Sequence, residues 1–196
     1  MKEHEVTLSK PMGIIFEEDE ANPDAGTVVK RIDPHGQTAA ACRFDPEGVD
    51  ICVRDTVIEV NGRDVKNKSL EDIMQMIMDG PQKIELVLSR PADAVVVRWP
   101  NGISVAAKPG DSFGFIAQHE AFINIPYSCT SGGCGSCEQS ILSEDGGVSV
   151  IARVYLIFLT NMLSSQSLRY IRPCVARVGK GSPAIIVNPS DRFAAP

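Results

Sequence analysis

Apolar and polar residues follow two different spacings along residues 1–90. In segment 4–10 they alternate, which predicts a β-strand, and segments 27–32 and 83–90 are also interpreted as strands. In segment 70–78 the apolar residues recur three, four and seven positions after Leu70, and Ser69 just before them is a favourable N-cap. We therefore expect an amphipathic helix there.

Turn residues separate these segments at recognisable places. The Asn61-Gly62 pair lies between two extended runs and is a strong short-range signal for a hairpin. The loop 11–13 precedes a further predicted strand at 14–18, and residues 36–41 suit a short helix. The predicted order is strands, helix, strands, helix, strand.

This order resembles a PDZ domain over most of residues 1–90. The resemblance rests on segment 11–14 as the carboxylate-binding loop, on segment 54–62, and on their spacing to the helix after Ser69. It implies a partly open β-barrel or sandwich with two helices, in which a partner's C-terminus adds a strand between segment 14–17 and that helix. The family usually has a glycine where this chain has Arg54.

The resemblance also implies which residues bind the peptide. Its terminal carboxylate would lie on the amides of Met12, Gly13 and Ile14. Lys10 would assist this contact. The pocket for the last side chain would be lined by Met12, Ile14 and Ile77.

A second specificity position lies at the start of the predicted helix. Many PDZ domains have a histidine there that binds a serine or threonine hydroxyl, but this chain has Leu70, followed one turn later by Met74. We therefore predict an apolar residue at the third-from-last position of the peptide. The alternative is that Leu70, Met74 and Ile77 are only core residues of an amphipathic helix.

The second half of the chain has its own set of predicted elements. Residues 94–107 indicate a hairpin around Asn101-Gly102, residues 111–120 a capped helix, and residues 184–187 a closing strand. We predict an α+β protein with domains at 1–90 and 94–196, joined by a short linker at 91–93.

Four cysteines give this second half its candidate chemistry. Cys129, Cys134 and Cys137 lie within nine residues separated largely by glycine and serine, and Cys174 follows after 36 intervening residues. Neighbouring thiolates repel one another unless a cation neutralises them. The C-x4-C-x2-C spacing with one distant cysteine is the plant-type [2Fe-2S] arrangement.

With the preceding residues 126–128, these cysteines resemble the plant-type [2Fe-2S] ferredoxins over roughly residues 93–191. The resemblance implies a β-grasp fold and a cluster bound by the four cysteines. Glycines at 132, 133 and 135 would let loop amides approach the cluster and help to set its reduction potential.

Two other uses of the cysteines are possible. A structural zinc site usually takes paired C-x2-C motifs, whereas this chain offers one triplet and one distant cysteine. Disulfides would need an oxidising compartment, and no secretory signal begins the sequence. Cys42 and Cys52 are expected to be buried, unreactive thiols.

The segment between Cys137 and Cys174 is longer than plant-type ferredoxins usually have. It could be an inserted element packed near the cluster. Alternatively, residues 154–166 could come from a retained intron, which transcript reads that skip those codons would support.

Composition narrows the possible partners. The net charge of -6 is unevenly distributed: residues 1–90 have 18 acidic and 11 basic residues, whereas the remainder has 7 acidic and 8 basic residues. There is no basic stripe with interleaved aromatics, so nucleic acid is not an expected partner. No apolar run is long enough for a membrane helix.

Together these features predict a one-electron carrier that a PDZ-like domain tethers to a partner's C-terminus. The redox partner would be a reductase or an acceptor protein. The sequence has no G-x-x-x-x-G-K-[ST] phosphate loop, no H-E-x-x-H motif and no flavin-binding fingerprint, so no self-contained catalytic site is expected. The alternative is a scaffold or assembly factor for a photosynthetic or respiratory complex, with a structural or redox-sensing cluster. By resemblance, we expect a plastid location first and a mitochondrial one second.

Overall fold

The structure, a computed structural model, describes residues 1–19, 26–45, 48–143, 148–149, 167–179 and 184–188. The possible insertion at 154–166 lies outside these residues. Contacts divide the chain into two compact units, Met1–Ala92 with Asn101–Ala106, and Asp93–Pro100 with Ala107–Pro196. Within the described ranges, no helix is both long and apolar enough to cross a bilayer.

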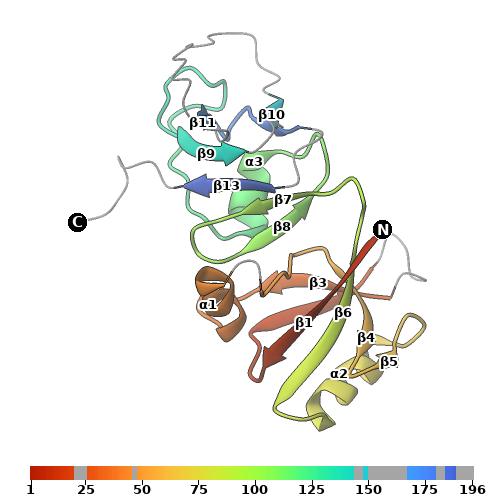
Figure 1. The fold of residues 1–196 in the computed structure, drawn as a ribbon. Coiled ribbons are helices and arrows are strands. Elements are labelled where there is room, and N and C mark those ends of the chain that lie inside the picture. Colours follow the sequence, from red (N-terminus) through yellow and green to blue (C-terminus); the bar gives the residue numbers. More distant parts are fainter. Residues whose placement is uncertain (20–25, 46–47, 144–147, 150–166, 180–183, 189–196) are drawn as a thin grey trace. The chain divides into compact units, whose positions relative to one another are not determined.

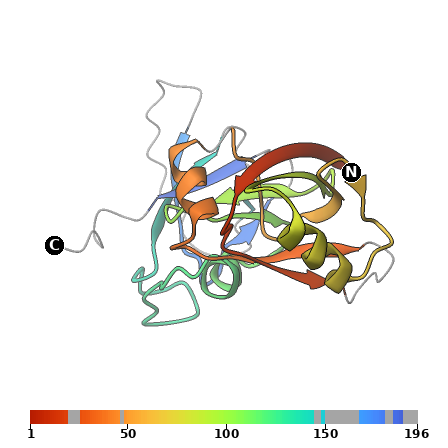
Figure 2. The same ribbon diagram turned by 90° about the horizontal axis from the view of Figure 1, so that it is seen from below.

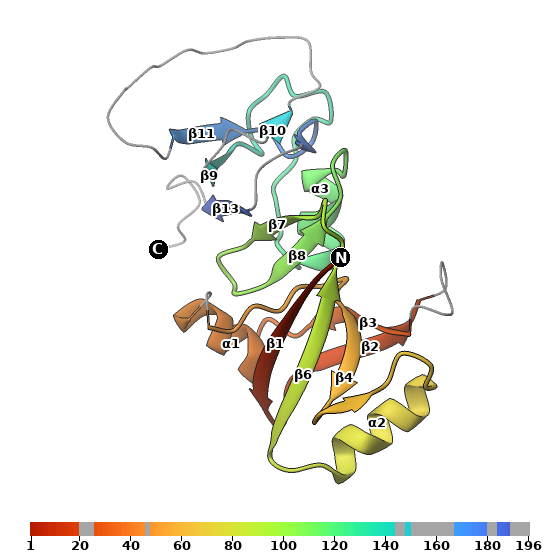
Figure 3. The ribbon, with the colours of Figure 1, turned by 45° about the vertical axis from the view of Figure 1, so that its right-hand side comes forward.

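The first unit is built on one sheet with the strand order β1-β6-β4-β3-β2, and β5 pairs with β4 (Figure 1). β1 and β6 are antiparallel along their whole length, from Lys2 opposite Arg90 to Ser9 opposite Lys83. Figure 3 shows β1, β6 and β4 side by side. The strands are β1 (Lys2–Ser9), β2 (Ile14–Glu18), β3 (Thr27–Ile32), β4 (Thr56–Val60), β5 (Arg63–Asp64) and β6 (Lys83–Arg90).

Two helices complete this unit, α1 (Gln37–Phe44) and α2 (Leu70–Asp79) (Figures 2 and 3). The Ser69 side chain accepts a hydrogen bond from the Asp72 amide at 3.2 Å, as the sequence predicts. The apolar stripe of α2 buries Ile73 and Ile77 against the unit's core. The segment is therefore the amphipathic helix that the spacing of its apolar residues predicted.

The hairpin between β4 and β5 confirms the Asn61-Gly62 prediction. Both residues have positive φ, 49° for Asn61 and 72° for Gly62, which is the backbone that this residue pair tolerates in tight hairpins. Arg54 also has positive φ, at 77°. The position at which the PDZ family usually has glycine therefore does adopt the conformation that favours glycine.

A second sheet, most of whose strands belong to the second unit, has the order β11-β9-β13-β7-β8. β13 runs parallel to β7 and antiparallel to β9, so the closing strand lies in the middle of the sheet. β10 and β12 form a separate pair. The strands are β7 (Val95–Arg98), β8 (Ser104–Ala107), β9 (Gln139–Ser143), β10 (Val148–Ser149), β11 (Ser167–Ile171), β12 (Arg177–Val178) and β13 (Ala184–Asn188).

The helix predicted at 111–120 is shorter and less regular than expected. It consists of α3 (Phe113–Phe115), capped by Ser112, and a π-helical segment η2 (Ile116–Glu120). Phe113, Ile116 and Ala117 are fully buried, which explains why the segment keeps its position despite the irregular hydrogen bonding.

The predicted α+β fold class is confirmed, with an open sheet in the first unit and the β-grasp order of elements in the second. Residues Asn101–Ala106 pack with the first unit. Backbone hydrogen bonds hold them there: the Val53 amide donates to the Ser104 carbonyl at 2.9 Å, and the Ala106 amide donates to the Val53 carbonyl at 3.0 Å. The domain boundaries at 90 and 94 stay a prediction.

Candidate functional site

The segment 129–137, here called the cysteine loop, has no regular secondary structure and lies between η2 and β9. Hydrogen bonds within and beside it fix its path. The Ser128 amide donates to the Ser136 hydroxyl at 2.9 Å, and the Glu138 amide donates to the Gly135 carbonyl at 3.1 Å. The loop is thus held by contacts between residues close in the sequence.

The structure brings the four predicted ligands together as two pairs. The Cys134 amide donates to the Cys129 sulfur at 3.4 Å, and the sulfurs of Cys137 and Cys174 lie 3.2 Å apart. In the described ranges, no three Cys, His, Asp or Glu residues are close enough together to hold one metal ion. Two pairs suit a two-iron cluster, in which four thiolates are shared between the irons.

The two pairs have different proton affinities. Hydrogen bonds from the backbone and side chain of Cys134 lower the pKa of the Cys129 thiol to about 6. Burial, followed by the hydrogen bond to Cys137 and its charge, raises the pKa of the Cys174 thiol to about 11. Two crowded thiols resist losing both protons, and a bound cation would relieve that repulsion. None of the six cysteines forms a disulfide.

Gly132 is positioned where a side chain would be strained. Its φ is +77°, and a Cβ atom would lie 3.1 Å from a methyl carbon of Val175. Its amide also donates a hydrogen bond to the Cys174 sulfur. The close approach of a loop amide to a ligand sulfur is the role that the sequence predicted for the glycines of this loop.

The turn that carries Cys174 is held from two sides. The amides of the two residues after Cys174 both donate to the Arg172 carbonyl at 2.9 Å, and the Gly114 amide in α3 donates to the Pro173 carbonyl at 3.1 Å. Sequence reasoning missed the contact of the Arg172 guanidinium with the Gly132 carbonyl, because nothing in the spacing of residues indicates it.

Tyr127 lies just before the cysteine loop. Its hydroxyl is buried and has no hydrogen-bond partner among the described residues. Burial raises the pKa of Tyr127 to about 12, and the charges of Cys137 and Cys174 add to the shift. A protonated hydroxyl beside these cysteines fits an anionic cluster, whose sulfurs accept hydrogen bonds.

The predicted peptide site lies at the edge strand β2 and at α2. The Asp33 amide donates to the Gly13 carbonyl at 2.8 Å, and the Thr38 hydroxyl donates to the Met12 carbonyl at 2.7 Å. Within the described part of the chain, the amides of Met12 and Gly13 donate to no acceptor. These amides are thus available for a carboxylate. The predicted site consists of Lys10, Met12, Gly13, Ile14, Leu70, Met74 and Ile77.

Both ends of α2 are tied to residues that flank the predicted peptide site. The Lys10 ammonium donates to the carbonyls of Met78 at 3.0 Å and Gly80 at 2.8 Å, so it caps the C-terminal end of the helix. At the other end, the Leu70 amide donates to the Glu18 carboxylate at 3.4 Å. Sequence reasoning predicted a carboxylate contact for Lys10 and did not predict this cap.

The apolar members of the predicted peptide site differ in exposure. Met12 and Ile77 are 8% and 4% exposed, whereas Ile14, Leu70 and Met74 are half-buried. The first two could form the floor of a pocket and the other three its accessible walls. A separate depression of ≈ 670 Å³ beside α2 includes none of these residues.

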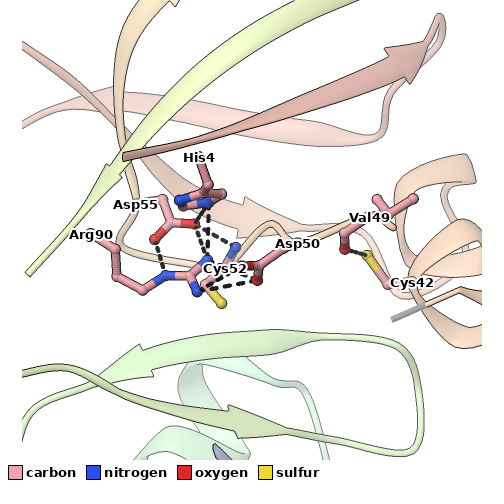
Figure 4. Close-up of polar contacts among 7 residues, drawn as sticks. All are labelled: His4, Cys42, Val49, Asp50, Cys52, Asp55 and Arg90. Carbon is pink, nitrogen blue, oxygen red and sulfur yellow. Dashed lines mark hydrogen bonds and ion pairs between the residues drawn. The ribbon is translucent and has the colours of Figure 1, made fainter. Parts of the chain in front are cut away.

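A buried ionic cluster in the first unit was missed by sequence reasoning. Figure 4 shows the Arg90 guanidinium between two carboxylates. Arg90 donates to both oxygens of Asp55 at 2.8 Å and to Asp50 at 3.1 Å, and His4 lies 3.2 Å from the same guanidinium. Burial alone would lower the pKa of Arg90, but these carboxylates raise it above its ordinary value. The cluster joins β1, β6 and the loop before β4.

Residues 3–89 match the family model described as PDZ domain, and residues 97–154 match the model described as 2Fe-2S iron-sulfur cluster binding domain. The chain is a PDZ domain followed by a 2Fe-2S domain. Its cofactor is accordingly a [2Fe-2S] cluster. The second match ends before Cys174, so the assignment of that ligand stays a prediction.

Among solved structures, the PDZ domain from choanoflagellate SHANK1 bound to a GIRK3 peptide is similar to part of this chain. The two are 19% identical, and the match covers 46% of this chain and 93% of the SHANK1 chain with a TM-score of 0.38. A comparison with curated proteins gives no match.

Proposed function

We propose that the chain is a one-electron carrier whose [2Fe-2S] cluster is held by Cys129, Cys134, Cys137 and Cys174. The observation that carries this proposal is the arrangement of these thiols as two pairs, with three thiols on the glycine-containing cysteine loop and Cys174 on a separate turn. When bound, the cluster supplies reversible one-electron chemistry. The protein's own residues supply thiolates, amide hydrogen bonds at the sulfurs and a partly buried site.

The PDZ domain would tether this carrier to the C-terminus of a donor, an acceptor or an assembly complex. Support comes from the unsatisfied amides of Met12 and Gly13 and from the position of β2 at the sheet edge. Binding through one domain raises the effective concentration of the other beside its partner. Electron delivery would then be dedicated to the tethered partner.

The half-buried side chains of Leu70 and Met74 support an apolar residue at the third-from-last position of the peptide. A polar hydroxyl at that position would lose water without gaining a hydrogen bond from either side chain.

The location we propose is the plastid, with the mitochondrion second, and a fluorescent fusion of the full chain tests it.

The decisive experiment is anaerobic purification of the full chain, followed by iron and zinc analysis, visible spectroscopy and low-temperature EPR. Two irons per chain and an EPR signal on one-electron reduction are expected. An iron-free, colourless protein would contradict the proposal. Replacing each of the four cysteines in turn with serine should lower iron content, whereas Cys42→Ser should leave it unchanged.

Electron exchange with a ferredoxin reductase separates a carrier from a scaffold with a structural cluster. A carrier should be reduced and reoxidised repeatedly by the reductase. A loaded cluster that exchanges no electrons under these conditions would favour the scaffold.

A further inference from the structure

The guanidinium of Arg172 lies across the cysteine loop. Its Nη1 donates to the Gly132 carbonyl, and its Nη2 lies 3.5 Å from the position that a Cβ atom on Gly135 would occupy. Gly132 and Gly135 flank Cys134 on both sides. One side chain therefore spans the backbone around an exposed candidate ligand.

Arg172 is also connected to the distant ligand. Its carbonyl accepts the two amides that follow Cys174, and the Gly132 amide donates to the Cys174 sulfur. The same residue thus holds the turn of Cys174 with its backbone and the cysteine loop with its side chain. In the sequence, 36 residues separate Cys137, the last residue of the cysteine loop, from Cys174.

The charge of Arg172 is only partly balanced. Its Nε lies 3.5 Å from the Glu138 carboxylate, and the two side chains are 37% and 32% exposed. A guanidinium remains charged at every practical pH and presents its donors in a fixed plane. Reduction adds one negative charge to the cluster, and a fixed cation beside the cluster stabilises the reduced form relative to the oxidised one.

We propose that Arg172 is a positioning residue that clamps the cysteine loop and raises the reduction potential, and that Glu138 opposes its charge. This inference rests on the proposed cluster site and concerns how that site is adjusted. The electron comes from an added one-electron reductant and returns to an added oxidant, so no further reactant is needed.

The test is a redox titration of the anaerobically purified full chain, followed by EPR. Arg172→Gln should lower the equilibrium constant for one-electron reduction by about tenfold, which corresponds to about 59 mV. Arg172→Lys should lower it less, because the charge stays but the planar fork is lost. Glu138→Gln should shift it in the opposite direction. Lys108→Gln, which removes one exposed positive charge elsewhere in the same unit, is the matched control.

A second measurement does not need the cluster. In the apo chain, amide hydrogen exchange at residues 133 and 134 should be about tenfold faster in Arg172→Gln than in Lys108→Gln, because a charge-assisted hydrogen bond is lost. Equal potentials in Arg172→Gln and Lys108→Gln would overturn the inference. If Arg172→Gln does not bind iron, the inference is overturned when Glu138→Gln has the same reduction potential as the unsubstituted protein. Iron-free unsubstituted protein would instead contradict the proposed function.

Discussion

Gly132 tolerates substitution least in the cysteine loop, because it combines positive φ with a close neighbour at 3.1 Å. Gly132→Ala should impose about 1–2 kcal/mol of backbone strain and displace the amide that bonds Cys174. We expect less than a full complement of iron per chain, measured by iron analysis and visible absorption. Gly133→Ala is the matched control, since its nearest atom is 3.8 Å away. Equal iron contents would contradict this account.

Arg90 and Asp55 form a buried pair, 5% and 0% exposed. Arg90→Met keeps much of the side-chain volume but leaves the Asp55 carboxylate buried without its cation. The free energy of unfolding should fall by about 3–5 kcal/mol, measured by hydrogen exchange in β6 of the full chain under increasing urea.

The exposed pair of Lys30 and Glu17 provides the control for Arg90. These side chains are 61% and 43% exposed at a separation of 2.6 Å. Glu17→Gln should change stability by less than about 1 kcal/mol, because solvent screens the pair. Similar losses in both variants would show that burial does not strengthen the Arg90 cluster.

At the scale of single residues, local signals were predictable and long-range contacts were not. Arg54 has a left-handed backbone where the PDZ family usually has glycine, and Asn61 and Gly62 have one in the predicted hairpin turn. The cysteine spacing likewise indicates the cofactor. Lys10 on the end of α2 and Arg172 on the cysteine loop depend on partners 68 or 40 residues away, which no local pattern encodes.

Helix α2 determines the predicted specificity of the peptide site. Leu70→His should let a serine or threonine at the third-from-last peptide position form a hydrogen bond, with a gain in affinity of about threefold to tenfold for such peptides. Fluorescence polarisation with paired apolar and hydroxyl peptides measures this change. Gln75→His, on an exposed position of the same helix, should leave both affinities unchanged. If Leu70→His also leaves both affinities unchanged, this end of the helix does not contact the peptide.

Elements with strong local signals were predicted well. Ser69 begins α2, and the Asn61-Gly62 pair forms its hairpin. The capped helix expected at 111–120 is present from Phe113 to Glu120, but from Ile116 on it is π-helical, which the sequence did not indicate. The hairpin predicted at 94–107 is present as β7 and β8, whereas the backbone hydrogen bonds of Ser104 and Ala106 with Val53 were not predicted, because Val53 lies outside any local window.

Across the whole molecule, peptide binding and cluster binding should be separable. Gly13→Ala places a Cβ atom 3.0 Å from Gly36 at a φ of +71°, so peptide affinity should fall by about tenfold. The iron content and EPR spectrum should not change. Gly62→Ala has similar positive φ but open space around it, and it should keep peptide affinity. Loss of iron in Gly13→Ala would contradict the prediction that the peptide and the cluster bind at independent sites.

The distance in sequence between Cys137 and Cys174 has a consequence for biogenesis. The last thiol leaves the ribosome long after the PDZ domain has been completed, and domains generally fold as units, N-terminal first, during synthesis. The residues of the predicted peptide site are thus complete on the growing chain before the fourth predicted cluster ligand is added. Folding of the PDZ domain does not have to wait for iron.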